Sequence, residues 1–182
     1  EVENNILYNG DTLILVPDKH EGDVLIREGT TRIIYDSLNG LVSADDKEMS
    51  LSVPSSVTNI ESRINLNINK FIVSADNNNY SSKDGVLFNK DGTTLISVPS
   101  YYEKLEYVID AENISSYALM NNIILKTITL TDSVKSIERN SIYGRGELGI
   151  RTVINNSSVL FSNYYYDTDY DISIETNDGT QS

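Results

Sequence analysis

The stretch Asn79–Pro99 reads NYSSKDGVLFNKDGTTLISVP, and the rest of the chain is organised around it. Two short apolar runs, 86–88 and 95–98, flank the turn segment NKDGTT at 89–94. Asn, Asp and Gly tolerate the positive φ angles that tight hairpin turns require. Asp84-Gly85 marks a turn into the first run, and Pro99 forbids further ladder bonding after the second. The stretch therefore predicts an antiparallel β-hairpin.

A second version of this pattern opens the chain. Residues 6–17 read ILYNGDTLILVP and residues 86–99 read VLFNKDGTTLISVP, so both follow the order apolar, aromatic, Asn, turn, Thr-Leu-Ile-x-Val-Pro. Further on, SVTNIE at 56–61 is matched by SVKSIE at 133–138. The offset is 82 at the prolines (99 − 17) and 77 at the valines (134 − 57), a drift that loops absorb. These matched segments indicate an internal duplication.

A shorter period runs inside each copy. Leu125-x-x-Ile128-x-Leu130 has the L-x-x-L-x-L spacing of a leucine-rich-repeat strand, and Ile68-x-x-Phe71-x-Val73 repeats it. Steps of 27, 20, 36, 21 and 23 residues separate the successive markers Ile26, Val53, Val73, Ile109, Leu130 and Val153. The step of 36 contains the hairpin, which explains its excess. Since no unit covers its own core, neighbouring units must stack.

The spacing predicts an α+β fold that leans to all-β. It is a short leucine-rich-repeat-like solenoid of stacked strands with short helical turns, interrupted by β-hairpins. One such helical turn is expected at Ile114–Met120. The expected organisation is a single repeat domain, 1–182, with two degenerate copies at about 1–78 and 79–158, capping strands at 159–175 and a frayed tail at 176–182.

The hairpin stretch closely resembles the NYSS-x-DGVL(Y/F)NKDGTTL segment of BspA-like leucine-rich-repeat proteins of bacterial surfaces. Residues 128–143 (ITLTDSVKSIERNSIY) are similar to the family's ITIPDSVTSIGDNAF. The chain departs from the family at Thr131, where Pro is usual, at Ser141-Ile142-Tyr143, which replaces an Ala-Phe helix, and in its lack of Cys. The resemblance implies an extracellular or cell-surface location on a bacterium and adhesion to matrix proteins or to other bacteria.

Composition limits the classes of partner. A net charge of −13 and a pI near 4.3 weigh against nucleic acid, whose phosphates demand a basic face, and against anionic membranes. No apolar run approaches a membrane span of roughly 20 residues. The absence of Cys excludes disulfides and thiolate metal sites. The chain begins at Glu1 without a leader, which indicates either a removed signal peptide or an excised segment.

The sequence holds no convincing constellation of catalytic or metal-binding residues. His20, the only histidine, lies in an expected loop, and no G-x-S-x-G elbow accompanies it. Asp167-x-Asp169-x-Asp171 offers oxygen ligands, and Asp178 falls at the twelfth place of an EF-hand loop, but Ile172 occupies the sixth place, where Gly is needed. A solvated acidic strand is the better interpretation. The sequence thus predicts no catalytic residue, no metal site and no cofactor.

Tyrosine dominates the aromatic residues, with 12 Tyr, 3 Phe and no Trp. Tyrosine combines a large apolar face with a polar group, which suits a recognition surface. The densest clusters give five candidate ligand-binding residues, expected as exposed anchors: Tyr101, Tyr102, Tyr164, Tyr165 and Tyr166. As one strand, the tail would place Tyr164, Tyr166 and Tyr170 on the same face. The alternative is that half-buried tyrosines line strand edges and caps.

Two functional hypotheses remain open. The first is a secreted or cell-surface bacterial binding module, not an enzyme, that recognises an extracellular protein or glycan through its solenoid face. The second is a non-catalytic spacer or accessory region of a larger surface protein, which would have no ligand of its own. The sequence predicts neither a nucleic-acid partner nor membrane insertion, and it leaves the oligomeric state and the ligand open.

Overall fold

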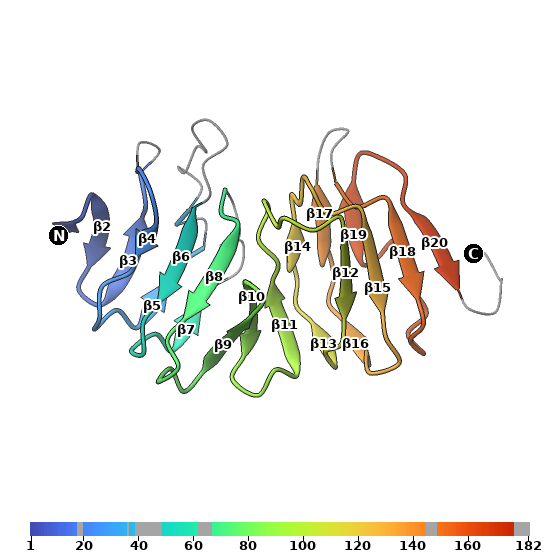
Figure 1. The fold of residues 1–182 in the computed structure, drawn as a ribbon, viewed down its shortest axis with the longest axis horizontal. Helices are drawn as coiled ribbons and strands as arrows, with labels where there is room; N and C mark the ends of the chain where they lie inside the picture. Colours follow the sequence, from blue (N-terminus) through green and yellow to red (C-terminus); the bar gives the residue numbers. More distant parts are fainter. Residues whose placement is uncertain (18–19, 36, 39–48, 62–66, 145–148, 177–182) are drawn as a thin grey trace.

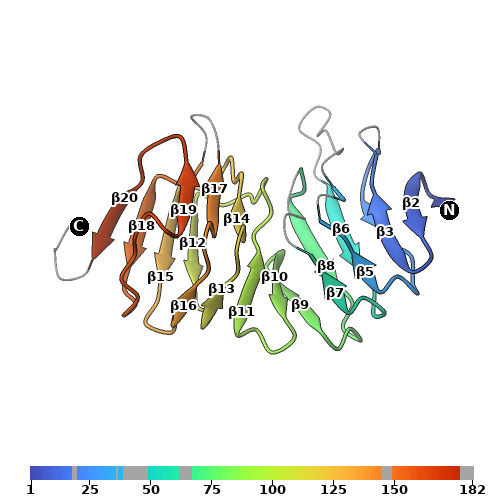
Figure 2. The ribbon, with the colours of Figure 1, turned by 180° about the vertical axis from the view of Figure 1, so that it is seen from behind.

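The computed structural model describes all residues except 18–19, 36, 39–48, 62–66, 145–148 and 177–182. The described residues form strands and turns that stack in sequence order from the N-terminus to the C-terminus (Figures 1 and 2). The strands are β1 (Val2–Glu3), β2 (Ile6–Asn9), β3 (Thr12–Leu15), β4 (Val24–Leu25), β5 (Arg32–Ile33), β6 (Ser50–Val53), β7 (Asn59–Ile60), β8 (Lys70–Val73), β9 (Tyr80–Lys83), β10 (Val86–Asn89), β11 (Thr94–Ser97), β12 (Glu106–Ile109), β13 (Asn113–Ile114), β14 (Leu119–Met120), β15 (Thr127–Leu130), β16 (Ser136–Ile137), β17 (Ile142–Gly144), β18 (Thr152–Asn155), β19 (Tyr166–Thr168) and β20 (Ser173–Thr176).

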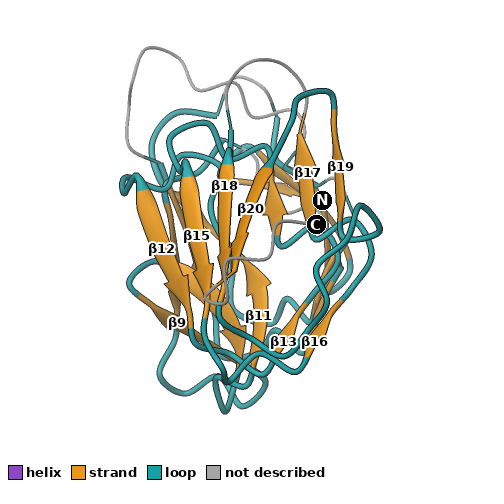
Figure 3. Cartoon of the chain, turned by 90° about the vertical axis from the view of Figure 1, so that its right-hand side faces the viewer, coloured by secondary structure: helices purple, strands orange, loops and turns teal. Residues whose placement is uncertain are grey.

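The C-terminal half is a β-solenoid with strands on three sides. Parallel strands β12-β15-β18-β20 form one side and β14-β17-β19 a second, while β13 and β16 continue the third side from β11. Figure 3 shows these sides around the periphery of the coil, seen from the C-terminal end. Stacked coils of this kind satisfy the backbone groups of each strand through the neighbouring coil.

The N-terminal half repeats the same pairing. Its sheet β1-β2-β3-β5-β7 and the later sheet β9-β10-β11-β13-β16 each begin with three antiparallel strands and continue with two parallel ones. We call the strands β1–β3 the first meander and β9–β11 the second meander. The parallel sheet β4-β6-β8 corresponds to β12-β15-β18. The copy boundaries given above remain a prediction.

The second meander joins two hydrophobic core clusters. Val86 in β10 is fully buried in the cluster of the C-terminal half, whereas its neighbour Leu87 is fully buried in the cluster of the N-terminal half. Successive side chains of a strand point to opposite faces, so a single strand serves both clusters. The hairpin predicted from residues 79–99 therefore also links the two halves of the molecule physically.

The expected helical turns are a wrong prediction: no helix occurs in the described part of the chain. The segment expected as a helical turn, Ile114–Met120, instead contains the end of β13, a turn and β14. Tyr117 and Asn121 have positive φ angles of 59° and 50°, which a helix does not accept. The backbone of Leu119 donates to Ser141 in the next coil, so pairing between coils replaces helical bonding.

Three finer points of the sequence analysis differ from the structure. The tail does not form one strand, because Tyr164 and Tyr165 precede β19 and a separate strand, β20, follows. The markers Ile109 and Leu130 pair with each other, but Leu130 pairs in turn with Asn155, two residues after the marker Val153. Thr176, the first residue of the expected frayed tail, belongs to β20, and the rest of that tail lies outside the described residues.

Candidate binding groove

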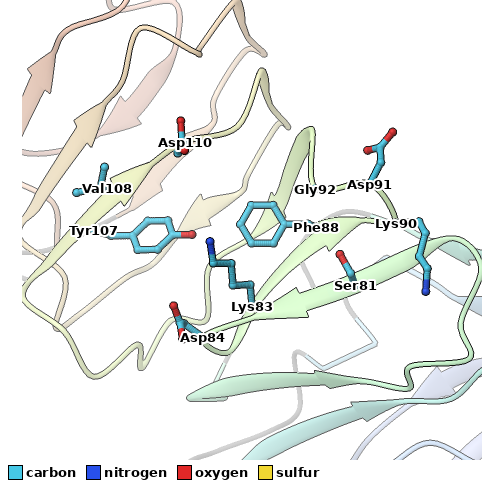
Figure 4. Close-up of a pocket in the computed structure, with 10 residues that line it drawn as sticks. All are labelled: Ser81, Lys83, Asp84, Phe88, Lys90, Asp91, Gly92, Tyr107, Val108 and Asp110. Carbon is cyan, nitrogen blue, oxygen red and sulfur yellow. The ribbon is translucent and has the colours of Figure 1, made fainter.

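A groove of about 330 Å³ lies between the second meander and β12. Figure 4 shows its residues, which come from β9, β10, the turns next to them and β12. They are Ser81, Lys83, Asp84, Phe88, Lys90, Asp91, Gly92, Tyr107, Val108 and Asp110. We call this feature the groove. Its lining combines two aromatic faces, one aliphatic side chain and charges of both signs.

The turn Asp84-Gly85 positions one wall of the groove. Both residues have positive φ angles, 52° and 79°, as in the two-residue turns that match the twist of a hairpin. The carbonyl of Gly85 accepts a hydrogen bond of 2.9 Å from the backbone of Phe71, which ties the turn to β8. A Cβ atom at Gly85 would lie 2.8 Å from the Cβ of Lys70, so the close approach requires glycine.

The loop between β10 and β11 forms the opposite rim. Asn89 Oδ1 accepts from the backbone of Thr94 at 2.8 Å, and Asn89 Nδ2 donates to Thr93 Oγ1 at 3.0 Å. Asp91 Oδ1 accepts from Thr93 Oγ1 at 2.7 Å and from the Thr93 backbone at 3.1 Å. These bonds lower the pKa of Asp91. Local side-chain bonds therefore hold this loop in one conformation.

The aromatic floor comes from β10 and β12. Tyr107 packs edge-on against Tyr102, with ring centroids 5.4 Å apart, and Phe88 and Tyr107 both pack against the C-terminal core cluster. Burial raises the pKa of the Tyr107 hydroxyl far above its ordinary value. The hydroxyl is therefore neutral at physiological pH and available as a hydrogen-bond donor and acceptor.

The charged side chains of the groove have different orientations. Lys83 points toward the hydroxyl of Tyr107 in Figure 4, and it makes no salt bridge with any described residue. Lys90 points away, because its ammonium group donates to the carbonyls of Ala75 and Asn77. Asp110 accepts from Thr131 Oγ1 at 3.1 Å, and hydrogen bonds from Ser133 and Thr131 lower its pKa. Lys83 is thus the cation that a ligand could engage.

Val108, one of the residues that line the groove, lies on the outer face of the sheet β12-β15-β18-β20. Val108, Thr129 and Ile154 lie in register on this face, with Val108 58% exposed and the other two half-buried. Their strand neighbours Ile109 and Leu130 point inward and are buried. Since residues in register on neighbouring strands share a face, Val108, Thr129 and Ile154 form a row across three coils next to the groove.

The five candidate tyrosines lie in two separate regions of the structure. Tyr101 and Tyr102 follow β11, and Tyr102 is only 4% exposed, contrary to the expected exposed anchor, because its ring packs against Tyr107 in the core. Tyr101 is half-buried beside Ile68, whose carbonyl accepts from its backbone. These two residues lie near the middle of the solenoid, whereas the others precede or enter β19, toward the C-terminal end (Figure 1).

Only one member of the C-terminal tyrosine cluster is strongly exposed. Tyr164 is 57% exposed, while Tyr165 and Tyr166 are half-buried and pack against Phe161, with ring centroids 5.6 and 6.2 Å from it. The arrangement brings Tyr164 to Tyr166 together in one aromatic cluster. Whether any of the five tyrosines contacts a ligand remains a prediction.

The other candidate groups are separate from the groove. Asp167 lies in β19, paired with Tyr143, and Asp169 and Asp171 follow that strand. Within the described ranges, no group of three or more His, Cys, Asp or Glu side chains could hold a metal ion, and Asp178 lies outside those ranges. His20 Nε2 lies 3.1 Å from the carbonyl of Asp23, at the edge of a second, N-terminal pocket of about 520 Å³.

The sequence contained the residues of the groove without showing that they meet. Asp84 and Phe88 belong to the hairpin pattern, whereas Lys83 and Tyr107 belong to no pattern that predicts a site. The available signal was the alternation in β12, which places Val108 outward when Ile109 is inward. That β12 packs beside the hairpin follows from the stacking of the coils and has no local pattern of its own.

Comparisons with known proteins identify the architecture. No family model and no curated protein matches the chain. Among solved structures, a leucine-rich repeat protein from Eubacterium ventriosum superposes with a TM-score of 0.52 and 22% identity, over 75% of this chain and 43% of that one. The fold is that of a leucine-rich-repeat protein.

A second solved structure has the same leucine-rich-repeat fold. A leucine rich cell surface protein from Faecalibacterium prausnitzii superposes with a TM-score of 0.50 and 15% identity, over 86% of this chain and 60% of that one. The chain thus spans less than two thirds of either structure. This leucine-rich-repeat fold is the one expected from the resemblance to the BspA-like family. Among the described residues, no helix has the length and apolar character to cross a membrane.

Proposed function

We propose that this chain is a non-catalytic binding module of a bacterial surface, which holds an extracellular protein or glycan in the groove and along the outer face of β12-β15-β18-β20. The observation that carries the proposal is the groove itself. It places the ammonium group of Lys83 beside the hydroxyl of Tyr107, and the exposed Val108 lies on the outer face of the same strand as Tyr107. A bacterial surface location is supported by the description of the Faecalibacterium structure as a cell surface protein.

The physical argument is preorganisation. The Asp84-Gly85 turn is fixed on β8, and the loop from Asn89 to Thr93 is fixed by its own side chains. A ligand therefore does not have to order these walls, which reduces the entropic cost of binding. Aromatic faces beside a cation and carboxylates suit both sugar rings and peptide side chains.

The test is binding of labelled protein to an array of extracellular matrix proteins, mucins and glycans at physiological salt. We expect saturable binding to at least one component. The double substitution Lys83→Ala with Val108→Ser should weaken that binding by about tenfold or more, because it removes the cation and the apolar rim. The matched control is Leu25→Ser, since Leu25 is also 58% exposed and occupies the same place in β4 as Val108 does in β12.

Three results would contradict the proposal. Binding that the double variant retains at full strength would place the contact elsewhere. An equal loss in Leu25→Ser would indicate a general effect of exposed apolar residues. A lack of binding to every component of the array would favour the spacer hypothesis over a binding module. Circular dichroism of each variant separates loss of binding from loss of fold. Tyr164→Ser, tested in the same array, decides whether the exposed tyrosine contributes.

A further inference from the structure

One edge of β12 has no neighbouring strand. In the part of the chain that the structure describes, β12 pairs only with β15, and the two strands run parallel. The carbonyls of Leu105 and Ile109 accept hydrogen bonds from the coil of β15. Because the peptide groups of a strand point alternately to its two sides, those of Glu106 and Val108 point away from β15. Among the described residues, the backbones of Glu106 and Val108 have no hydrogen-bond partner.

The edge of β8 on the side of the second meander is covered instead. β8 is the last strand of the parallel sheet β4-β6-β8, and β12 is the first strand of the next parallel sheet. The second meander lies between them in the sequence. Its Gly85 carbonyl accepts from the N–H of Phe71 at 2.9 Å, and Ser82 Oγ accepts from the N–H of Val73 at 3.0 Å. The second meander thus satisfies the edge of β8 and leaves the edge of β12 open.

The groove lies along this open edge of β12. Tyr107, Val108 and Asp110 line it together with residues of the second meander, and none of its described lining residues comes from β15. In Figure 4, the rings of Tyr107 and Phe88 extend toward each other from β12 and β10. An unpaired strand edge beside an apolar surface is the arrangement to which an extended peptide adds as a further strand.

The outer face of β12 indicates which side chains such a peptide would carry. Glu106, Val108 and Asp110 are exposed and alternate with the inward residues Tyr107 and Ile109. An added strand places its own alternate side chains opposite them, where opposite charges and apolar pairs are favourable. A matching peptide therefore has a basic, an apolar and a basic residue at alternate positions. This pattern reads the same in both chain directions, so it fits a parallel and an antiparallel strand equally.

The other charges of the groove also favour a basic peptide. Asp84 and Asp91 add two carboxylates to the lining. The ammonium group of Lys90 points away and is bound to two backbone carbonyls outside the groove. Lys83 is the remaining cation of the lining, and its N–H groups can donate to the carbonyls of a peptide. The net charge of −13 attracts basic partners at longer range.

We propose that the groove holds an extended segment of a partner protein, which adds to the open edge of β12 as a further strand. Its backbone pairs with the peptide groups of Glu106 and Val108, and its basic side chains lie opposite Glu106 and Asp110. Main-chain bonds supply affinity in this mode, and the alternate side chains supply specificity. The inference rests on the proposed binding function, and it narrows the ligand from a protein or glycan to an extended basic peptide.

Fluorescence polarisation with short labelled peptides tests the pattern. The probe peptides carry lysine or arginine, then valine, then lysine or arginine at alternate positions, with serine and threonine between them. Scrambled peptides of the same composition are the matched control. We expect saturable binding of the probes, and binding of the scrambled peptides that is weaker by about tenfold or more. Binding of the probes should weaken as salt rises, because the paired charges are exposed.

N-methylated probes separate backbone pairing from side-chain contact. Methyl groups on alternate peptide nitrogens give two versions of a probe, one for each edge of the added strand. The version methylated on the edge that faces β12 should lose binding, because its N–H donors are gone, and the other version should retain it. Equal affinity of the two versions would overturn the proposal.

Variants of the protein test the position of the added strand. Val108→Pro removes the N–H that faces the groove without removing a bond to β15, so probe binding should fall by about tenfold or more. The matched control Leu25→Pro makes the same change at the corresponding place in β4 and should leave binding unchanged. Glu106→Lys should weaken the probes and favour a peptide in which glutamate replaces one basic residue. This exchange of charge decides the matter if Val108→Pro impairs folding.

The outcomes separate this inference from the proposed function. A glycan on the array that binds the wild type and not the double variant, together with no binding of any probe peptide, would uphold the binding function and overturn the peptide as its ligand. A dimer of the wild type that Val108→Pro dissociates would show a second copy of the chain at this edge, and it would overturn the proposal as well. Probe binding that survives both Val108→Pro and Glu106→Lys would also overturn it.

Discussion

Asn77 shows how a single polar residue connects the two halves of the molecule. It is fully buried, and its Nδ2 donates to the carbonyls of Pro54 and Val57 at 2.8 and 3.0 Å. Its Oδ1 accepts from the backbones of Asn79 and Tyr80, both at 2.8 Å. One side chain thus satisfies backbone groups of the coil before it and of the meander after it.

Replacing Asn77 should therefore destabilise the fold strongly. Asn77→Ala leaves these backbone groups without partners in a buried site, and we expect a loss of about 2–4 kcal/mol in the free energy of unfolding. The exposed neighbour gives the matched control, since Asn78→Ala should change the free energy by less than about 0.5 kcal/mol. Urea denaturation followed by circular dichroism measures both, and equal effects would contradict the account.

Two glycines of the second meander allow the cost of backbone strain to be measured separately from the cost of a close contact. Gly85 and Gly92 have similar φ angles of 79° and 76°, but only Gly85 has Lys70 against the position of a Cβ atom, and Gly92 has nothing within 4 Å. Gly92→Ala should cost about 1 kcal/mol through backbone strain alone. Gly85→Ala should cost more, since β8 must also shift away from the turn. Equal losses in denaturation experiments would show that the contact with Lys70 is unimportant.

At the scale of the element, β10 is the strand on which both core clusters depend. Its residues Val86 and Leu87 point into different clusters. This hairpin could be predicted from the sequence, because its turn residues and apolar runs are local features. The predicted helical turn at Ile114–Met120 is wrong, because bonding between coils, which depends on residues more than 20 positions apart, outweighs local preference.

The burial of Leu87 has a direct consequence for stability. Leu87→Ala should lower the free energy of unfolding by about 2–5 kcal/mol, as for other fully buried leucines. Leu7→Ala, at the same place in the first meander, should cost less than about 1 kcal/mol because Leu7 is 37% exposed. Urea denaturation of the two variants measures the difference. Similar losses would mean that the two meanders are covered alike.

At the scale of the whole molecule, the repeat pattern and the acidic composition were both evident from the sequence. The repeat predicted stacked coils, and the solved leucine-rich-repeat structures share that fold. The groove was not predictable, because it forms where β12 packs against a hairpin about 20 residues earlier in the sequence. The stacking of the coils, and no local pattern, places β12 beside that hairpin. Burial of Tyr102 likewise depends on its packing against Tyr107, which no local pattern specifies.

The pH dependence of stability follows from the carboxylates. Hydrogen bonds from Thr31, Ser50, Thr93 and Ser133 lower the pKa values of Asp11, Asp23, Asp91 and Asp110, respectively, from an ordinary value of 3.8. A pKa that is lower in the folded state stabilises the fold above the ordinary pKa, and this stabilisation is lost as pH falls through the folded value. We expect Tm to fall progressively below about pH 4 in calorimetry. A Tm that rises on acidification would contradict this assignment.

The central claim is that the groove beside the second meander binds the ligand. Its most direct test is an NMR titration of ¹⁵N-labelled protein with the strongest component found on the array. We expect the backbone amides of Lys83, Asp84, Gly92 and Tyr107 to shift, together with those of Val108 and Thr129 on the adjoining sheet face. Shifts confined to the N-terminal pocket around His20 and Asp23, or to the aromatic cluster at Tyr164–Tyr166, would contradict the claim.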